Sequence, residues 1–315
     1  MQAIALAAAL IVLNKSAHEA VLVHPTSKET LTRFATGQGP HEVAVSPDGA
    51  RAYVSDYGAY QVFKDGSKSG PGKTITVLDL KGGKVAATWD LGEYTKPHGI
   101  AVSRDGKTVW VTVEGSKAVL DLDAATGRVR KAWKTGQDVS HMVVATPDEK
   151  KLYVANIGSG SVTIIDRAAD KVQSVKTGPG AEGIDASPDG KEIWVGNREA
   201  NTVSVIAVAT DEVVASFASG GEMPIRVEFT PDGKQVLVSN AKSASVTVFD
   251  VALRKLVDTV EVGAVPVGIQ LTPDGKTAYV ANTNDDKVSV IDVASKRVIG
   301  SFSPGREPDG MAWVP

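Results

Sequence analysis

The sequence contains no cysteine, few aromatic residues and no apolar run long enough to cross a membrane. Without cysteine the chain forms no disulfide, no thiolate metal site and no cysteine nucleophile. Aromatic residues make up 5% of the 315 residues and the formal net charge is −3. We therefore expect no nucleic-acid partner. Hydrophobic residues nevertheless make up 42% of the chain, which is ample for a packed core.

The first residues leave the cellular location open between two alternatives. Residues 3–13 form an apolar run of the length found in export signals, but no lysine or arginine precedes it. The repeat described below predicts that residues from about Ala9 onward form a folded strand. We expect a periplasmic or secreted protein whose export signal was removed or trimmed, with an intact cytoplasmic chain as the alternative.

A short pattern recurs six times along the chain, each copy beginning with Ser or Thr two residues before an Asp. These anchors are Ser46, Ser103, Thr146, Ser187, Thr230 and Thr272, at spacings of 57, 43, 41, 43 and 42 residues. A period near 42 residues is typical of four-stranded propeller blades. In each unit an apolar strand precedes a turn based on Pro-Asp-Gly, and three further short strands follow it. An Asp at the end of the third strand is expected to form a turn, as at Asp79, Asp121 and Asp166.

The two ends of the chain complete a seventh unit. Residues 9–37 match three strands of the repeat but lack its first strand, and residues 308–315 supply that strand. Pairing the first strand of the chain with the last removes the open edges of the array. The sequence thus predicts one all-β domain, a seven-bladed β-propeller with four antiparallel strands per blade. The predicted blades span residues 41–92, 97–136, 140–178, 181–221, 224–263, 266–305, and 308–315 with 9–37.

The second-strand motifs also resemble a known family. YVSD, WVTV, YVAN, WVGN and LVSN each follow the turn and precede a strand like VTIID. This arrangement is similar to the YVTN-repeat β-propellers, a group that includes YncE-like periplasmic proteins and archaeal surface-layer proteins. The resemblance covers nearly the whole chain. It implies the fold, but it does not specify a function, because propellers carry out many functions.

The position five residues before each anchor holds histidine in three consecutive units. From unit one to unit seven it reads His41, His98, His141, Glu182, Ile225, Val267 and Asp309. This position starts the innermost strand, so the side chains should converge at one mouth of the central channel. Imidazoles and carboxylates are usual ligands of Zn, Cu, Ni and Fe, so we expect His41, His98, His141 and Glu182 to hold a divalent ion. A hydrogen-bonded polar cluster, or an anion site using Arg226, is the alternative.

A second position, at the end of the second strand, also varies between units. It is Asn in units three to seven, whereas we align Asp56 and Glu114 with it in units one and two. Unit one also carries an insertion in the following loop, from Tyr57 to Gly72, which is expected to form a flap over the same mouth. The further ligand-binding candidates at this mouth are Glu42, Tyr57, Asn156, Asn197, Arg198, Arg226 and Asp309.

The sequence supports two functions over a third, a structural surface-layer element. The first is a monomeric binding protein that takes a small molecule or a protein at this mouth, with or without a divalent metal ion as cofactor. The second is a metal-dependent hydrolase, lactonase or lyase, in which Glu182 completes the metal site or acts as a base and Arg226 stabilises an oxyanion. The sequence has no nucleophile elbow, phosphate-binding loop or paired-histidine helix motif.

Overall fold

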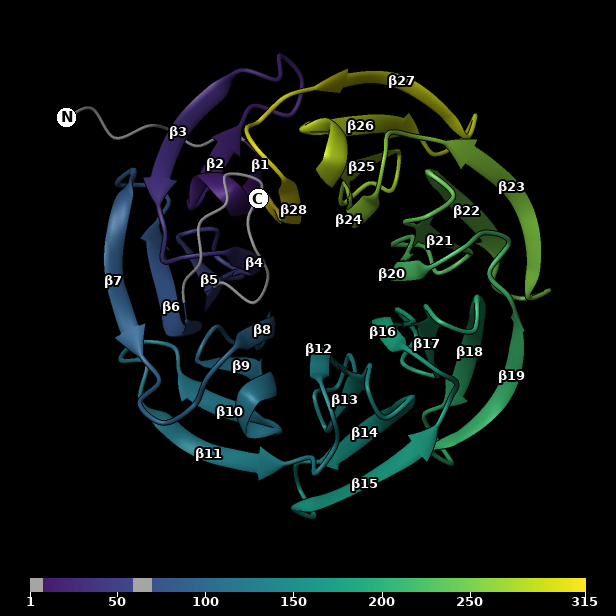
Figure 1. Cartoon of the computed structure of the whole chain (residues 1–315), viewed down its shortest axis with the longest axis horizontal. Helices are drawn as coiled ribbons and strands as arrows, with labels where there is room; N and C mark the ends of the chain where they lie inside the picture. The colour runs from purple at the N-terminus through teal and green to yellow at the C-terminus, as the bar shows by residue number, and fades with distance from the viewer. Residues whose placement is uncertain (1–7, 59–69) are drawn as a thin grey trace.

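In the computed structural model, which describes residues 8–58 and 70–315, seven four-stranded sheets surround a central axis (Figure 1). Each sheet is antiparallel and forms one blade, numbered here as in the sequence. The strands nearest the axis are β4, β8, β12, β16, β20, β24 and β28 (Figure 1). The predicted seven-bladed propeller is therefore confirmed.

The first three blades follow one another along the chain. Their strands are β4 (Pro40–Val45), β5 (Arg51–Gly58), β6 (Pro71–Asp79) and β7 (Lys84–Asp90); β8 (Pro97–Val102), β9 (Thr108–Val113), β10 (Ala118–Asp123) and β11 (Val129–Lys134); and β12 (Ser140–Ala145), β13 (Lys151–Asn156), β14 (Ser161–Asp166) and β15 (Lys171–Lys176).

Blades four to six repeat the same order. Their strands are β16 (Ala181–Ala186), β17 (Glu192–Asn197), β18 (Thr202–Ala207) and β19 (Glu212–Ala218); β20 (Pro224–Phe229), β21 (Gln235–Asn240), β22 (Ser245–Asp250) and β23 (Lys255–Glu261); and β24 (Pro266–Leu271), β25 (Thr277–Asn282), β26 (Lys287–Asp292) and β27 (Arg297–Phe302).

Blade seven is built from both ends of the chain, as predicted. Strand β28 (Pro308–Val314) pairs with β1 (Ala9–Asn14), and β2 (Glu19–Val23) and β3 (Thr30–Ala35) complete the sheet. Single-turn 3-10 helices η1 (Lys15–Ala17), η2 (Glu114–Ser116) and η3 (Thr283–Asp285) follow the second strands of blades seven, two and six. Among the described residues, no helix is long and apolar enough to span a membrane.

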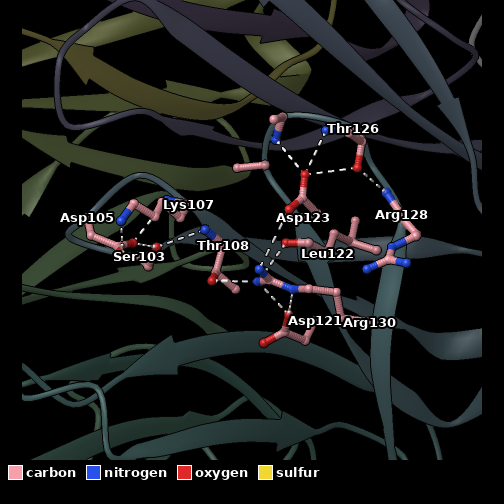
Figure 2. Close-up of polar contacts among 12 residues, drawn as sticks. Ser103, Asp105, Lys107, Thr108, Asp121, Leu122, Asp123, Thr126, Arg128 and Arg130 are labelled. Carbon is pink, nitrogen blue, oxygen red and sulfur yellow. Dashed lines mark hydrogen bonds and ion pairs between the residues drawn. The ribbon is translucent and has the colours of Figure 1, made fainter.

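The repeated turn is held by the anchor itself. In blade two, the Ser103 hydroxyl donates to Asp105 Oδ1 at 2.7 Å and accepts from the amide of Thr108 at 2.9 Å (Figure 2). The following glycine takes a left-handed conformation, as at Gly106 with φ 69°. In blade three Glu149 occupies this position with φ 55°. The turn therefore forms even without glycine, because the anchor side chains already fix it.

The turn after the third strand differs from the prediction in blade two. Asp123, rather than Asp121, accepts the amides of Ala125 and Thr126 at 3.1 and 2.9 Å. Asp121 instead accepts a hydrogen bond from Arg130 Nε at 2.7 Å, and the same guanidinium reaches the Thr108 hydroxyl (Figure 2). The sequence prediction placed this turn two residues too early.

The core lies between neighbouring blades. Where the second strand has an aromatic residue, this residue packs on the next blade, as Trp110 does on Leu152 and Val154, and as Trp194 does on Val236. Trp110 and Trp194 are fully buried. This packing joins neighbouring blades around the ring.

Candidate functional site at the channel mouth

Each innermost strand contains an extra residue close to its start. In blade one, Pro40 pairs with Asp56 and Val43 pairs with Val54, so three steps on β4 match two steps on β5. The same irregularity occurs near the start of the innermost strand in the other six blades. Such a bulge re-aims side chains, and it directs two consecutive residues toward the channel. We call the residue at the His41 position of each blade the bulge position.

The seven bulge positions meet at one cavity of about 330 Å³. Every residue that the sequence aligned at this position lines the cavity. The lining residues are Lys15, His41, Glu42, Tyr57, Gly58, His98, His141, Met142, Glu182, Ile225, Arg226, Val267, Glu307 and Asp309. The convergence expected from the repeat is therefore present.

The three histidine rings lie side by side on one wall of this cavity. The His98 and His141 rings stack with centroids 3.6 Å apart, and the His41 and His98 centroids are 5.1 Å apart. The Tyr57 ring lies against both His41 and His98, at 4.7 and 5.4 Å. Blades one to three thus contribute a continuous wall of rings.

His141 is held between two carboxylates. Its Nδ1 lies 2.6 Å from Glu114 Oε1, and its Nε2 lies 3.5 Å from Glu182 Oε1. Tyr57 donates to Glu114 at 2.6 Å, and Arg198 donates to Glu182 at 3.1 Å. Burial alone would lower the pKa of His141, but the two carboxylates raise it to about 9. Burial alone would raise the pKa of Glu114, but His141 and Tyr57 lower it.

The other two imidazoles are neutral at physiological pH. Burial and the positive charges of its neighbours hold the pKa of His98 well below its usual value. Burial and the charge of Lys15 lower the pKa of His41 to about 4. His41 Nδ1 lies 2.8 Å from the carbonyl of Gly39, to which it donates. His98 is 4% exposed, and its Nδ1 has no hydrogen-bond partner among the described residues.

One group of these side chains is arranged like a metal site. A ligand atom from each of His98, Glu114 and His141 lies within 4.8 Å of the other two. Ligands of one tetrahedral zinc ion are about 3.4 Å apart, given bonds near 2.1 Å. The three side chains are therefore close enough together to be candidate ligands of one ion. His41 and Glu182, which the sequence also suggested as metal ligands, border this group.

The floor of the cavity is an ion pair between opposite blades. The Arg226 guanidinium pairs with Glu42, and its Nη1 lies 3.6 Å from Met142 Sδ. Burial alone would lower the pKa of Arg226, but Glu42 raises it. Beside the floor, Lys15 Nζ lies 2.9 Å from Asp309 Oδ2.

The position at the end of the second strand, which is Asn in blades three to seven, is occupied by a different residue than predicted in blade two. Pro97 pairs with Val113, whereas the matching residue of blade one pairs with Asp56. Val113, not Glu114, therefore takes the Asn position in blade two, and the alignment of Glu114 was wrong by one residue. The third strand explains why blade two has a valine here. Blade one has the hydroxyls of Thr74 and Thr76 beside Asp56, whereas blade two has Ala118 and Leu120 at the equivalent places.

The residue after the Asn position, which we call the rim position, contacts a histidine in blades one and two. From blade one to blade seven it is Tyr57, Glu114, Ile157, Arg198, Ala241, Thr283 and Lys15, and in each blade its amide donates to an equivalent carbonyl. Sequence reasoning named Tyr57, Glu114 and Arg198 but did not identify their shared position, and it missed Lys15 and Met142. The signal was present, because each rim residue directly follows the second-strand motif.

The remaining candidates lie between strands rather than at the cavity. Asp56 accepts hydrogen bonds from the amide of Gly37 and the hydroxyls of Thr74 and Thr76, at 2.8–3.0 Å. Asn156 and Asn197 likewise bond to Ser and Thr side chains of their own blades. The structure thus gives these three residues local hydrogen-bond roles. Residues 59–69 of the expected flap lie outside the described residues.

Comparisons with known proteins agree with the fold. A family model described as YNCE-like beta-propeller matches residues 72–272. Hydrazine synthase of Kuenenia stuttgartiensis is 21% identical with a TM-score of 0.73, over 87% of this chain and 89% of that chain. The periplasmic gluconolactonase PpgL of Pseudomonas aeruginosa is 19% identical with a TM-score of 0.78, over 98% of this chain and 99% of that chain.

A further similar structure comes from Desulfotomaculum acetoxidans, a protein of unknown function that is 14% identical with a TM-score of 0.80, over 97% of this chain and 98% of that chain. No curated protein matches the sequence. At these identities the solved structures support the propeller architecture alone.

Proposed function

The chain belongs to the YncE-like β-propeller family, and on that premise we propose that it is a binding protein whose channel mouth holds a divalent transition-metal ion. His98, His141 and Glu114 bind the ion in this proposal, and the adjoining cavity takes a small molecule. Imidazole and carboxylate together suit Zn, Cu, Ni and Fe.

The observation that carries this proposal is the state of His98. Its ring is buried, neutral and stacked on His141, yet its Nδ1 has no partner among the described residues. An unsatisfied buried nitrogen costs about 1–3 kcal/mol. A metal ion would satisfy this atom and use the two neighbouring donors at the same time.

A polar cluster without metal is the competing interpretation. Glu114, His141 and Glu182 already form a hydrogen-bonded chain that holds one proton on the imidazole. This chain accounts for His141 and both acids, but it leaves His98 without a role. The two interpretations therefore differ in what they expect of His98.

Metal analysis separates them. We expect protein purified without an affinity tag to contain up to one transition-metal ion per chain, and the metal-free protein to bind Zn²⁺ in calorimetry. His98→Ala should weaken Zn²⁺ binding by about 100-fold or more, because the loss of a residue that only orients a ligand already costs about 10–100-fold. The matched control is Val267→Ala, which alters the same bulge position in blade six. Failure of the wild-type protein to bind Zn²⁺, Cu²⁺ or Ni²⁺ would exclude the metal proposal.

A metal-dependent hydrolase is the second candidate, and the composition of the ligand set favours it. Two histidines and one glutamate are a set found in catalytic zinc sites, which keep a coordination position for water. A metal ion bound there would lower the pKa of that water. Arg226 lines the same cavity and would stabilise an oxyanion. Turnover of lactones and esters by the metal-loaded protein, and its loss with a chelator, would distinguish catalysis from binding.

We further propose that the protein works in the periplasm or outside the cell. The support is the family resemblance, together with the similar fold of PpgL, which is described as periplasmic. Fractionation of cells that express the complete gene tests this location, and a protein found wholly in the cytoplasm would contradict it.

A further inference from the structure

The residue that follows each bulge position lies where one innermost strand meets the next. This residue is Gly99, Gly183, Gly268 or Gly310 in blades two, four, six and seven, and Glu42, Met142 or Arg226 in blades one, three and five. Four interfaces between blades therefore have no side chain at this point, while three have a large one.

The glycines are required because the neighbouring backbone lies where a side chain would begin. A Cβ atom on Gly99 would lie 2.5 Å from the carbonyl oxygen of His141 and 2.7 Å from Met142 Cα. The corresponding distance is 2.3 Å from Gly268 to the carbonyl oxygen of Asp309. Contacts this short with backbone atoms would force the two strands apart.

The histidine distances follow this pattern. His98 and His141 face each other across the interface that contains Gly99, and their rings are 3.6 Å apart. His41 and His98 face each other across the interface that contains Glu42, and their rings are 5.1 Å apart. The closer of the two histidine pairs, His98 and His141, is thus the pair whose interface contains Gly99.

A hydrogen-bonded hydroxyl ties the innermost strands at both of these interfaces. Thr112 Oγ1 accepts from the amide of Gly99 at 2.8 Å and donates to the carbonyl of His141 at 2.6 Å. Ser55 Oγ makes the same two contacts between blades one and two, where it accepts from the amide of Glu42 at 3.1 Å and donates to the carbonyl of His98 at 2.6 Å. The hydroxyl tie is therefore common to both interfaces, and the glycine is the feature that distinguishes them.

We infer that Gly99 is a positioning residue that selects His98 and His141, rather than His41 and His98, as the imidazole pair of the site. The metal part of this inference rests on the proposed function. The ring geometry does not, since it is a property of the protein without metal. The two can therefore be tested separately.

The first experiment compares Gly99→Ala with Gly268→Ala. Both variants insert a methyl group against backbone and should lower thermal stability by similar amounts. We expect Gly99→Ala alone to weaken Zn²⁺ binding at least about tenfold, as a displaced ligand does. NMR of metal-free protein should show the His98 and His141 ring protons losing their stacking shifts in Gly99→Ala only. Unchanged ring signals in a folded Gly99→Ala protein would overturn the inference.

The second experiment separates the glycine from the hydroxyl tie. Thr112→Val keeps the shape of the side chain and removes the hydrogen bonds at the Gly99 interface, and Ser55→Ala removes the equivalent hydrogen bonds at the Glu42 interface. We expect the His98 and His141 rings to keep their stacking shifts in both variants, because Gly99 is retained. Loss of the stacking shifts in Gly99→Ala, together with no Zn²⁺ binding by the wild type, would uphold the positioning and refute the metal site. Loss of the stacking shifts in Thr112→Val would assign the pairing to the hydroxyl tie and refute the role of Gly99.

Discussion

Blades one to three and blades four to six have the same backbone arrangement but different side chains at the channel mouth. Both halves have the bulge, the anchored turn and the packed second strand. At the bulge position the first half has three histidines, whereas the second half has Glu182, Ile225 and Val267. The fold therefore offers seven equivalent positions at the mouth, and histidines occupy three adjacent ones on one side of it.

The floor of the cavity links the two halves, and breaking it should have the largest effect on stability. Arg226→Met removes the partner of Glu42, whose side chain is 10% exposed. Removing one member of a buried ion pair costs about 3 kcal/mol or more, so we expect urea denaturation to show a loss of this size. The double variant Arg226→Met with Glu42→Gln should recover much of it. No recovery would mean that Arg226 stabilises the floor by packing rather than by charge.

The fold could be predicted from the sequence because packing repeats. Each blade must fill the same space between its neighbours, so Trp110, Tyr153 and Trp194 recur at one position and reveal the period. Ring closure followed from the same logic, since β28 supplies the strand that residues 9–37 lack.

The site could be predicted only in part. The bulge position was visible because its residues align, but the pairing of His141 with Glu114 joins different blades and depends on side-chain reach. Lys15 and Met142 were missed for the same reason. Lys15 contacts Asp309 near the opposite end of the chain, and Met142 contacts Arg226 of another blade. The one-residue error at Glu114 arose because Val113 breaks the Asn series, and the sequence does not show which neighbour faces inward.

Asp56 offers a sharper comparison, because it replaces a neutral Asn in one blade only. Burial raises the pKa of Asp56 to about 6, although three hydrogen bonds lower it. A carboxyl with a raised pKa takes up a proton on folding, so its contribution to stability falls as the pH rises from about 4 through 6. We expect Asp56→Asn to stabilise the protein at pH 8 by up to about 3 kcal/mol, and by little at pH 4.

Thermal or urea denaturation of the Asp56→Asn variant at several pH values measures this effect. The matched control is Asn240→Asp, which places the charge at the same position of blade five. That variant should lose stability over the same pH range. A pH-independent difference between Asp56→Asn and the wild type would show that the charge of Asp56 is not the cause.

Glu114 lies one residue beyond the Asn position, where it contacts His141, whereas Asp56 lies at the Asn position and contacts its own blade and Gly37. We therefore expect the two carboxylates to have different roles. Glu114→Gln keeps the size of the side chain but removes the charge that faces His141, so the pKa of His141 should fall from about 9. Zn²⁺ binding should weaken about tenfold, because the amide is a poorer ligand than the carboxylate. Asp56→Asn also removes a buried carboxylate, yet it should leave Zn²⁺ affinity unchanged. NMR titration of the histidines and calorimetry measure the two effects, and equal Zn²⁺ affinity in Glu114→Gln and the wild type would remove Glu114 from the ligand set.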